Sequence, residues 1–187
     1  MRWRREAGSR RRDRWAGGPA PDRAVEFGWK AHAAQEAWTA KVDTKAAIFF
    51  TLQTALLAAL IAAHARERLL GQLTGWRHVL ADVSIGLSSI AVLVAGAAVI
   101  PLLGRSAAHR RGHRDHLIYF GHLRHWDPDD LAVRLHKLTA EDEMQQLSRQ
   151  LVELSRRNWK KHRRLQAAMT LAVAGAACVT LALMWPN

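Results

Sequence analysis

The sequence predicts an all-α membrane protein with three transmembrane helices and cytoplasmic helical extensions. Three apolar blocks, at residues 46–63, 83–103 and 167–185, contain no charged residue. Each approaches or reaches the roughly 20 residues that a helix needs to cross the hydrocarbon core. The chain is 49% apolar and its 44 charged residues (28 Lys and Arg, 16 Asp and Glu) all lie outside these blocks. A soluble domain with three buried helices is the alternative, and uncharged blocks of this length in so small a chain disfavour it.

The segment before the first block divides into two parts. Residues 1–23 are rich in Arg, Gly and Pro without an apolar period, which predicts a disordered basic tail ahead of a membrane domain at 24–187. Residues 24–45 contain no helix breaker after Gly28, so a helix should lead directly into the first span. Asp43 lies three residues from hydrocarbon, where a lone carboxylate is costly, so we expect it to pair with a basic group of another segment.

Small and polar residues inside the blocks indicate how the spans pack. Gln53, in the middle of the first span, should face another helix, because hydrocarbon offers its amide no partner. Small residues at four-residue spacing predict close helix contacts, although alanine is common enough for the spacing to arise by chance. The predicted small positions are Thr51, Ala55, Ala59 and Ala63; Ser84 and Ser88 with Gly86 and Gly96; and Ala168, Ala172, Ala176 and Thr180.

The segment at residues 104–164 is also predicted to be helical. Asp127 followed by Pro128 is an N-cap with proline at the first helical position. Thr139 and Asp142 resemble a capping box that opens another helix, with no breaker before the third span. This helix carries a narrow seam at three- and four-residue spacing, expected to pack on a helix of this chain or of a second copy. The seam consists of Met144, Leu147, Leu151, Leu154 and Asn158.

Lys and Arg are distributed unevenly around the blocks. There are 11 in residues 1–45, 3 in residues 64–82, 14 in residues 104–164 and none after Trp185. The positive-inside rule therefore places the N-terminus and residues 104–164 in the cytoplasm, and the short loop and the C-terminus outside. The net charge of +12 suggests an anionic partner: a lipid surface, a nucleic acid or a phosphorylated small molecule. No fold in the sequence supports binding to nucleic acid.

The sequence contains no catalytic constellation, so we expect a protein that is not an enzyme. It lacks a P-loop, a nucleophile elbow and a His-Glu-x-x-His pattern. The single cysteine, Cys178, provides neither an internal disulfide nor a thiolate metal site. Histidines cluster between the second and third blocks, but no carboxylate or cysteine completes a ligand set, so no metal site is expected. These histidines are His109, His113, His116, His122 and His125.

Three short motifs follow one another around the predicted spans. They are Asp43-x-Lys45-Ala46 before the first, Tyr119-Phe120-Gly121-His122 after the second, and Arg149-Gln150-Leu151 with Leu154-Ser155 and Lys160 before the third. Together, from about Trp29 to the C-terminus, they resemble the membrane effector domain of bacterial Pycsar anti-phage systems. The resemblance implies an inner-membrane effector that a cyclic pyrimidine nucleotide activates to impair membrane integrity during infection, with no cofactor and as a homo-oligomer.

A ligand of this kind would have to be bound by the helical portion, because no cyclic-nucleotide-binding β-barrel is present. Arginine suits a phosphate because it can bind two oxygens at once, and aromatic rings stack on bases. The predicted ligand-binding residues are Trp38, Asp43, Lys45, Tyr119, Phe120, Arg149, Arg156 and Lys160. The alternative for Trp38 is an interfacial anchor. The alternative for the whole protein is a constitutive membrane scaffold that docks a cytoplasmic partner.

Overall fold

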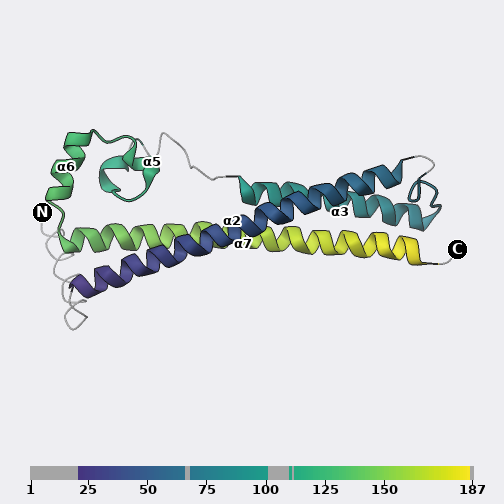
Figure 1. Ribbon diagram of the computed structural model, residues 1–187, viewed down its shortest axis with the longest axis horizontal. Coiled ribbons are helices and arrows are strands. Elements are labelled where there is room, and N and C mark those ends of the chain that lie inside the picture. The colour runs from purple at the N-terminus through teal and green to yellow at the C-terminus, as the bar shows by residue number, and fades with distance from the viewer. Residues whose placement is uncertain (1–20, 66–67, 101–109, 111, 186–187) are drawn as a thin grey trace, which may run out of the picture. The chain divides into compact units, whose positions relative to one another are not determined.

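The computed structural model describes residues 21–65, 68–100, 110 and 112–185. In chain order the elements are α2 (Pro21–His64), α3 (Trp76–Val99), the 3-10 helix η1 (His113–Asp115), α5 (Phe120–Leu123), α6 (Pro128–His136) and α7 (Ala140–Met184), as Figure 1 shows. No strand occurs among these residues, which confirms the all-α prediction. The described residues form two compact units: 21–34 with 110–151, the first unit, and 35–100 with 152–185, the membrane unit.

Three helices, α2, α3 and α7, are long and apolar enough to cross a membrane. The predicted helices leading unbroken into the first and third spans are confirmed, because α2 has 44 residues and α7 has 45. Residues 1–20 of the predicted basic tail lie outside the described residues, and residues 21–23 belong to the first turn of α2.

The helix that contains the second apolar block begins before it, and the limits of the membrane-spanning part stay a prediction. α3 begins at Trp76 rather than at residue 83 and ends at Val99, while residues 101–103 lie outside the described part of the chain. The added turns contain charged and polar side chains that an apolar run cannot include. Within the membrane unit these side chains have partners: Arg77 donates to a carbonyl of α7, and Asp82 contacts His64 and His78.

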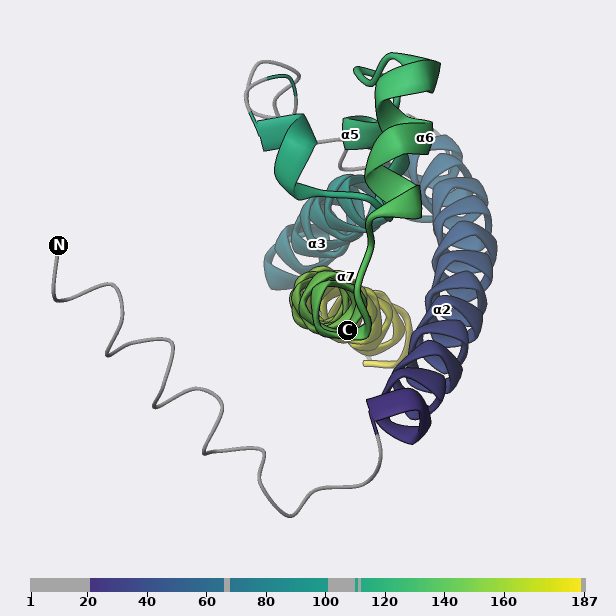
Figure 2. The same cartoon turned by 90° about the vertical axis from the view of Figure 1, so that its left-hand side faces the viewer.

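The interior of the membrane unit is built from small residues. On α3 the buried positions are Ala81, Ser84, Ser88, Ala91, Ala95 and Ala98; on α7 they are Leu165, Ala168, Ala172, Gly175 and Ala182. Both sets are consistent with a period of alternating three- and four-residue steps, which is the pattern of left-handed helix packing. Seen nearly end-on, α3 and α2 lie on different sides of α7 (Figure 2).

The predicted rows at every fourth residue are therefore only partly correct. Ser84, Ser88, Ala168 and Ala172 are buried, whereas Gly86, Ala176 and Thr180 are exposed. The row on α2 is wrong for Thr51, Ala55 and Ala59, which are exposed, whereas Ala63 is partly buried against the core. The fully buried positions of α2 in this unit are Ala46, Gln53 and Leu60. Helix contacts in this packing repeat every 3.5 residues on average. Residues spaced four apart therefore rotate away from the contact face within two turns.

The prediction for Gln53 is confirmed, since only 4% of this residue is exposed. Its Nε2 atom has no hydrogen-bond partner among the described residues. Another buried polar side chain of this unit is satisfied across helices: Ser84 Oγ donates to the carbonyl of Gly175 at 2.7 Å. A Cβ atom at Gly175 would come within 3.2 Å of that serine's carbonyl oxygen, so glycine permits the close approach of α3 and α7.

Arginines cap α3 and α7 reciprocally at the two ends of their contact. Arg77 near the start of α3 donates to the carbonyl of Ala182 at 2.8 Å, in the last turn of α7. Arg164 of α7 donates to the carbonyl of Ala97 at 2.9 Å, in the last turn of α3. The last carbonyls of a helix lack intrahelical partners and carry partial negative charge. Each helix thus supplies the cation that satisfies the end of the other.

In the first unit, the start of α2 packs on the start of α7. Leu147 is completely buried, and a Cβ atom at Gly28 would collide with its side chain. Trp29 Nε1 donates to Glu143 Oε1 at 2.7 Å. The predicted seam on α7 therefore packs within this chain at Leu147. Gln146 ties the preceding loop to α7 by donating to the carbonyl of Asp115 at 2.7 Å.

Local caps start α6 and α7 as the sequence predicts. Asp127 Oδ1 accepts from the backbone N–H of Asp129 at 2.9 Å, with proline at the first helical position. Thr139 Oγ1 accepts from Asp142 N at 3.2 Å, and Asp142 Oδ2 accepts from Thr139 N at 3.4 Å. The backbone hydrogen bond from Thr139 lowers the pKa of Asp142, with smaller contributions from the Thr139 hydroxyl and from Arg134.

Candidate functional site

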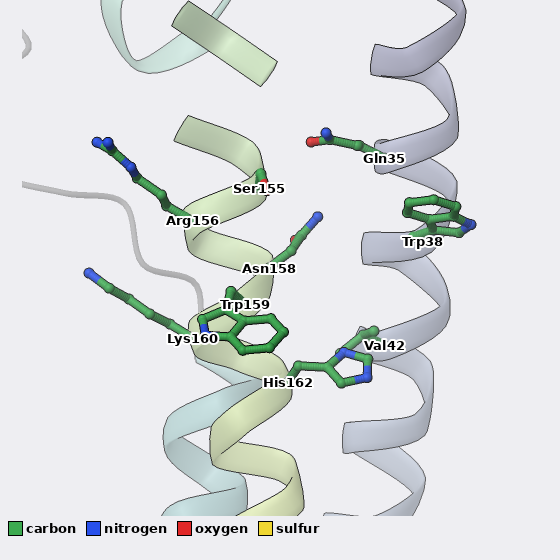
Figure 3. Close-up of a pocket in the computed structure, with 9 residues that line it drawn as sticks. All are labelled: Gln35, Trp38, Val42, Ser155, Arg156, Asn158, Trp159, Lys160 and His162. Carbon is green, nitrogen blue, oxygen red and sulfur yellow. The ribbon is translucent and has the colours of Figure 1, made fainter. Parts of the chain in front are cut away.

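A groove between α2 and α7 is the principal candidate site in the membrane unit. It has a volume of about 610 Å³, within the range of small-molecule sites. Its lining residues are Gln35, Trp38 and Val42 of α2 and Ser155, Arg156, Asn158, Trp159, Lys160 and His162 of α7 (Figure 3). On both helices, these residues precede the apolar segment that is long enough to cross the membrane.

The lining combines cations with open aromatic surface and includes no carboxylate. Arg156 and Lys160 are four residues apart and so lie on one face of α7. Figure 3 shows both side chains extending away from α2, while Asn158 and His162 extend toward α2. The indoles belong to Trp38, which is 63% exposed, and Trp159, which is 68% exposed. An anionic ligand with a flat ring matches this combination of groups.

Gln35 provides an unsatisfied acceptor in the groove. Its Oε1 atom is buried and has no hydrogen-bond partner among the described residues. Figure 3 shows the side chain extending toward α7. Buried side-chain oxygens in folded proteins almost always accept a hydrogen bond, so one without a partner indicates a place for a donor. A ligand N–H group would satisfy it.

Two polar contacts join α2 and α7 at the groove. Thr39 Oγ1 lies 2.9 Å from Asn158 Oδ1 and donates to it. The predicted pairing of Asp43 with a basic group is confirmed, because Lys161 Nζ lies 2.6 Å from Asp43 Oδ1. These contacts fix the register of the two helices beside the groove. They also assign the Asn158 end of the seam to α2 of the same chain.

The predicted ligand-binding residues fall into two groups. Trp38, Arg156 and Lys160 line the groove. Asp43 lies beside it in the ion pair with Lys161, and Lys45 is exposed without being part of the lining. Tyr119, Phe120 and Arg149 belong to the first unit instead. Their role in ligand binding stays a prediction.

In the first unit, aromatic and imidazole rings gather around η1 and α5. His116 and His122 have ring centroids 4.2 Å apart, and Tyr119 lies 4.6 Å from Phe120 and 5.7 Å from His122. His122 is buried, whereas Phe120 is 62% exposed. The described histidines of this segment are thus engaged in ring packing.

Sequence reasoning missed Gln35, Asn158, Trp159 and His162 as lining residues. Asn158 was assigned to the seam alone, and nothing in α2 singled out Gln35. A usable signal was present in the tryptophans. Trp38 and Trp159 each precede an apolar block by eight residues, which places two indoles at the same level of parallel helices.

Comparison with protein families identifies the chain more specifically than its geometry does. A family model described as the Pycsar effector protein domain matches residues 27–186. The match includes every residue of the groove and both described units apart from the first turns of α2. It confirms the resemblance inferred from the three short motifs. Neither a curated protein nor a solved structure gives a significant match.

Proposed function

The chain belongs to the Pycsar effector protein domain family, and we propose that a cyclic pyrimidine nucleotide activates it at the groove between α2 and α7. Family membership makes it an effector of an anti-phage system, and its three apolar helices make it a multi-pass membrane protein. The proposal adds the ligand, its site and the outcome, which is impaired membrane integrity. The proposal rests on the chemistry of the residues that line the groove.

The charge of the groove suits the phosphate of such a ligand. A cyclic nucleotide monophosphate carries one negative charge, and Arg156 with Lys160 offers two adjacent cations to it. A guanidinium can donate to two phosphate oxygens at once. Since none of the nine lining residues is acidic, no carboxylate of the lining competes for these cations.

The base finds complementary groups in the same groove. The exposed indoles of Trp38 and Trp159 provide faces for stacking. The unpartnered Gln35 Oε1 accepts one hydrogen bond, and a pyrimidine presents an N–H donor on its pairing edge, at N4 of cytosine or N3 of uracil. Gln35 Oε1 and the two indoles together favour a base over a simple anion.

Binding at this place acts on the spans directly. Both walls of the groove are formed by helices that continue into apolar segments. A ligand that fits one separation of α2 and α7 better than another shifts the population toward it. The Lys161–Asp43 pair joins the two helices beside the groove, so a change in the spacing of α2 and α7 would strain or break this ion pair. With three spans in each chain, opening a path through the bilayer requires a homo-oligomer.

The test measures dye uptake by cells that express the protein with and without a pyrimidine cyclase. We expect uptake only with the cyclase, and loss of uptake in Arg156→Ala. Losing one charge-assisted hydrogen bond, about 1.5–3 kcal/mol, should weaken nucleotide binding roughly ten- to a hundredfold. Arg163→Ala is the matched control, because Arg163 is an exposed arginine of α7 outside the lining.

Gln35→Leu separates ligand recognition from packing. Because Oε1 has no partner in the free protein, its removal should leave the thermal stability of the purified chain unchanged or raise it. The same change should reduce binding of cyclic CMP or cyclic UMP, measured by isothermal titration calorimetry. Cyclase-dependent uptake that survives both Arg156→Ala and Gln35→Leu would place the ligand elsewhere. Uptake without any cyclase would favour a constitutive membrane protein.

A further inference from the structure

Two histidines and an aspartate meet where α2 ends and α3 begins. His64 is the last residue of α2, and His78 and Asp82 lie one turn apart on α3. His64 Nε2 is 3.2 Å from Asp82 Oδ1, and His78 Nδ1 is 3.2 Å from Asp82 Oδ2. The two imidazole rings have centroids 5.0 Å apart. One donor atom from each residue thus falls in a cluster within 4.8 Å.

The spacing of these donors is close to that of a metal site. Zinc binds imidazole nitrogen and carboxylate oxygen at about 2.0–2.2 Å, so donors at two corners of a tetrahedron lie about 3.3–3.6 Å apart. Each imidazole nitrogen lies 3.2 Å from a different oxygen of Asp82. With one donor atom taken from each residue, all three lie within 4.8 Å of one another, so a bound metal would draw them together by about an ångström. The i, i+4 relation of His78 and Asp82 places both on one helical face.

The surroundings hold the cluster in place. After α2 the chain turns back, with the N–H of Leu70 donating to the carbonyl of Ala63 at 2.9 Å. Leu70 is 2% exposed and packs with Leu60 of α2 and Ala81 of α3. Ala81 adjoins Asp82, and Ala63 adjoins His64. The hydrophobic contact therefore positions the backbones that carry the donors, as a metal site requires.

The exposure of the three residues fits a site with one open position. His64 is the most buried of them, with 27% of its side chain exposed, and its Nδ1 atom is buried without a hydrogen-bond partner among the described residues. Its only hydrogen-bonding contact in this part of the chain is through Nε2, which faces the other donors. Asp82 is 52% exposed, so a metal and a water ligand can reach the cluster.

We propose that His64, His78 and Asp82 form a site for a divalent transition metal, with Zn²⁺ as the best match. Two imidazoles and one carboxylate suit zinc, nickel or copper, whereas Ca²⁺ and Mg²⁺ prefer all-oxygen ligands. A bound metal would tie the end of α2 to the start of α3. The site lies apart from the groove, and its existence does not depend on the proposed function. The sequence led us to expect no metal site, but that expectation considered only the histidines of residues 109–125 and not His64 or His78.

The test uses the full chain in detergent after removal of any histidine tag. We expect one Zn²⁺ per chain by elemental analysis, and a Co²⁺ absorption spectrum of the four-coordinate type. Asp82→Asn and His78→Ala should each weaken metal binding at least about 100-fold, since even the loss of a group that only supports a ligand costs 10–100-fold. Zn²⁺ should raise the melting temperature of the wild type and not of these variants.

Asp129→Asn and His136→Ala are the matched controls, because they make the same chemical changes at exposed positions of α6. Circular dichroism in EDTA establishes that each variant is folded. If His78→Ala fails to fold, Asp82→Asn, which keeps the side-chain volume, decides the question. Absence of binding to the wild type at micromolar Zn²⁺ would overturn the site, as would unchanged affinity in Asp82→Asn.

Discussion

Asp43 and Lys161 form an ion pair near the point where α2 and α7 become uncharged. Their charged atoms lie 2.6 Å apart, with 15% of the lysine side chain and 45% of the aspartate side chain exposed. A charge so close to hydrocarbon is costly when it stands alone. Because the two charges neutralise each other across two helices, each residue lowers the free-energy cost of placing the other near the hydrocarbon.

We expect Asp43→Asn to lower the stability of the purified chain by about 1–2 kcal/mol. The change leaves the mostly buried lysine without its counter-charge, and the exposure of Asp43 reduces the cost below that of a fully buried pair. Thermal unfolding in detergent, followed by circular dichroism, measures the effect. Asp115→Asn is the control, because Asp115 is exposed and forms no ion pair among the described residues.

A double-mutant cycle tests whether the two residues act as a pair. It compares Asp43→Asn, Lys161→Met and the variant that carries both changes. If the pair is the cause, removing both charges should restore part of the stability lost in Asp43→Asn. Additive losses in the double variant would show that the two residues act independently. Equal and negligible effects of Asp43→Asn and Asp115→Asn would contradict the importance of the pair.

At the scale of the helices, steps of three and four residues decide which faces meet. Small side chains at these positions let the backbones approach, and the Ser84 hydroxyl donates to the Gly175 carbonyl across the gap. The arginine caps fix the same register from the ends, since Arg77 and Arg164 each satisfy a carbonyl of the opposite helix. Close packing, interhelical hydrogen bonds and capping thus supply the association that the hydrophobic effect does not supply within a bilayer.

Gly175→Leu should destabilise the membrane unit by about 1–3 kcal/mol, the usual cost of overpacking a filled interior. A Cβ atom there would already lie 3.2 Å from a carbonyl oxygen and a hydroxyl of α3. Gly86→Leu is the matched control, because a Cβ atom at Gly86 meets nothing within 4 Å. The measurement compares folded yield and melting temperature in detergent. A larger loss in Gly86→Leu than in Gly175→Leu would refute the packing of α3 on α7.

At the scale of the whole molecule, tryptophans and charges indicate how the protein sits in the bilayer. Trp76 and Trp185 lie edge to face, 5.7 Å apart, where α3 begins and α7 ends. Trp38 and Trp159 lie toward the other end of the membrane unit. Tryptophan concentrates at both membrane interfaces, so the two pairs are placed as belts on either side of the apolar segments. The Lys and Arg counts of 11, 3, 14 and 0 predict that the Trp38 side faces the cytoplasm.

Cysteine labelling in intact cells tests this orientation. In a Cys178→Ala background, Thr74→Cys should react with a membrane-impermeant maleimide from outside. Asp130→Cys should react only after permeabilisation. Both positions are exposed, so access across the membrane is the only difference between them. Labelling of position 130 in sealed cells would show that the topology is the reverse of the predicted one. The groove would then lie outside the cell, where a nucleotide made in the cytosol could not reach it.

Local chemistry made much of the fold predictable from the sequence. Uncharged blocks of sufficient length mark the spans, because charge is excluded from hydrocarbon. The caps at Asp127 and Thr139 start helices through contacts within four residues, and those contacts are present. The isolation of Asp43 and Gln53 in apolar surroundings predicted that each would meet another helix. The order of three motifs was enough to indicate the family, which the match over residues 27–186 shows.

The tertiary structure alone decided which residues meet. Alanine is so frequent on every face of the spans that the sequence could not distinguish the buried face from the exposed one. The start of α3 was missed because its charged residues are compensated in the fold, Arg77 by the carbonyl of Ala182 and Asp82 by His64 and His78. Thr39 meets Asn158 across 119 positions, and the His64 cluster joins the ends of two helices. Such contacts depend on the rotation and register of one helix against another, which are set by the sum of many small packing energies and not by any local pattern.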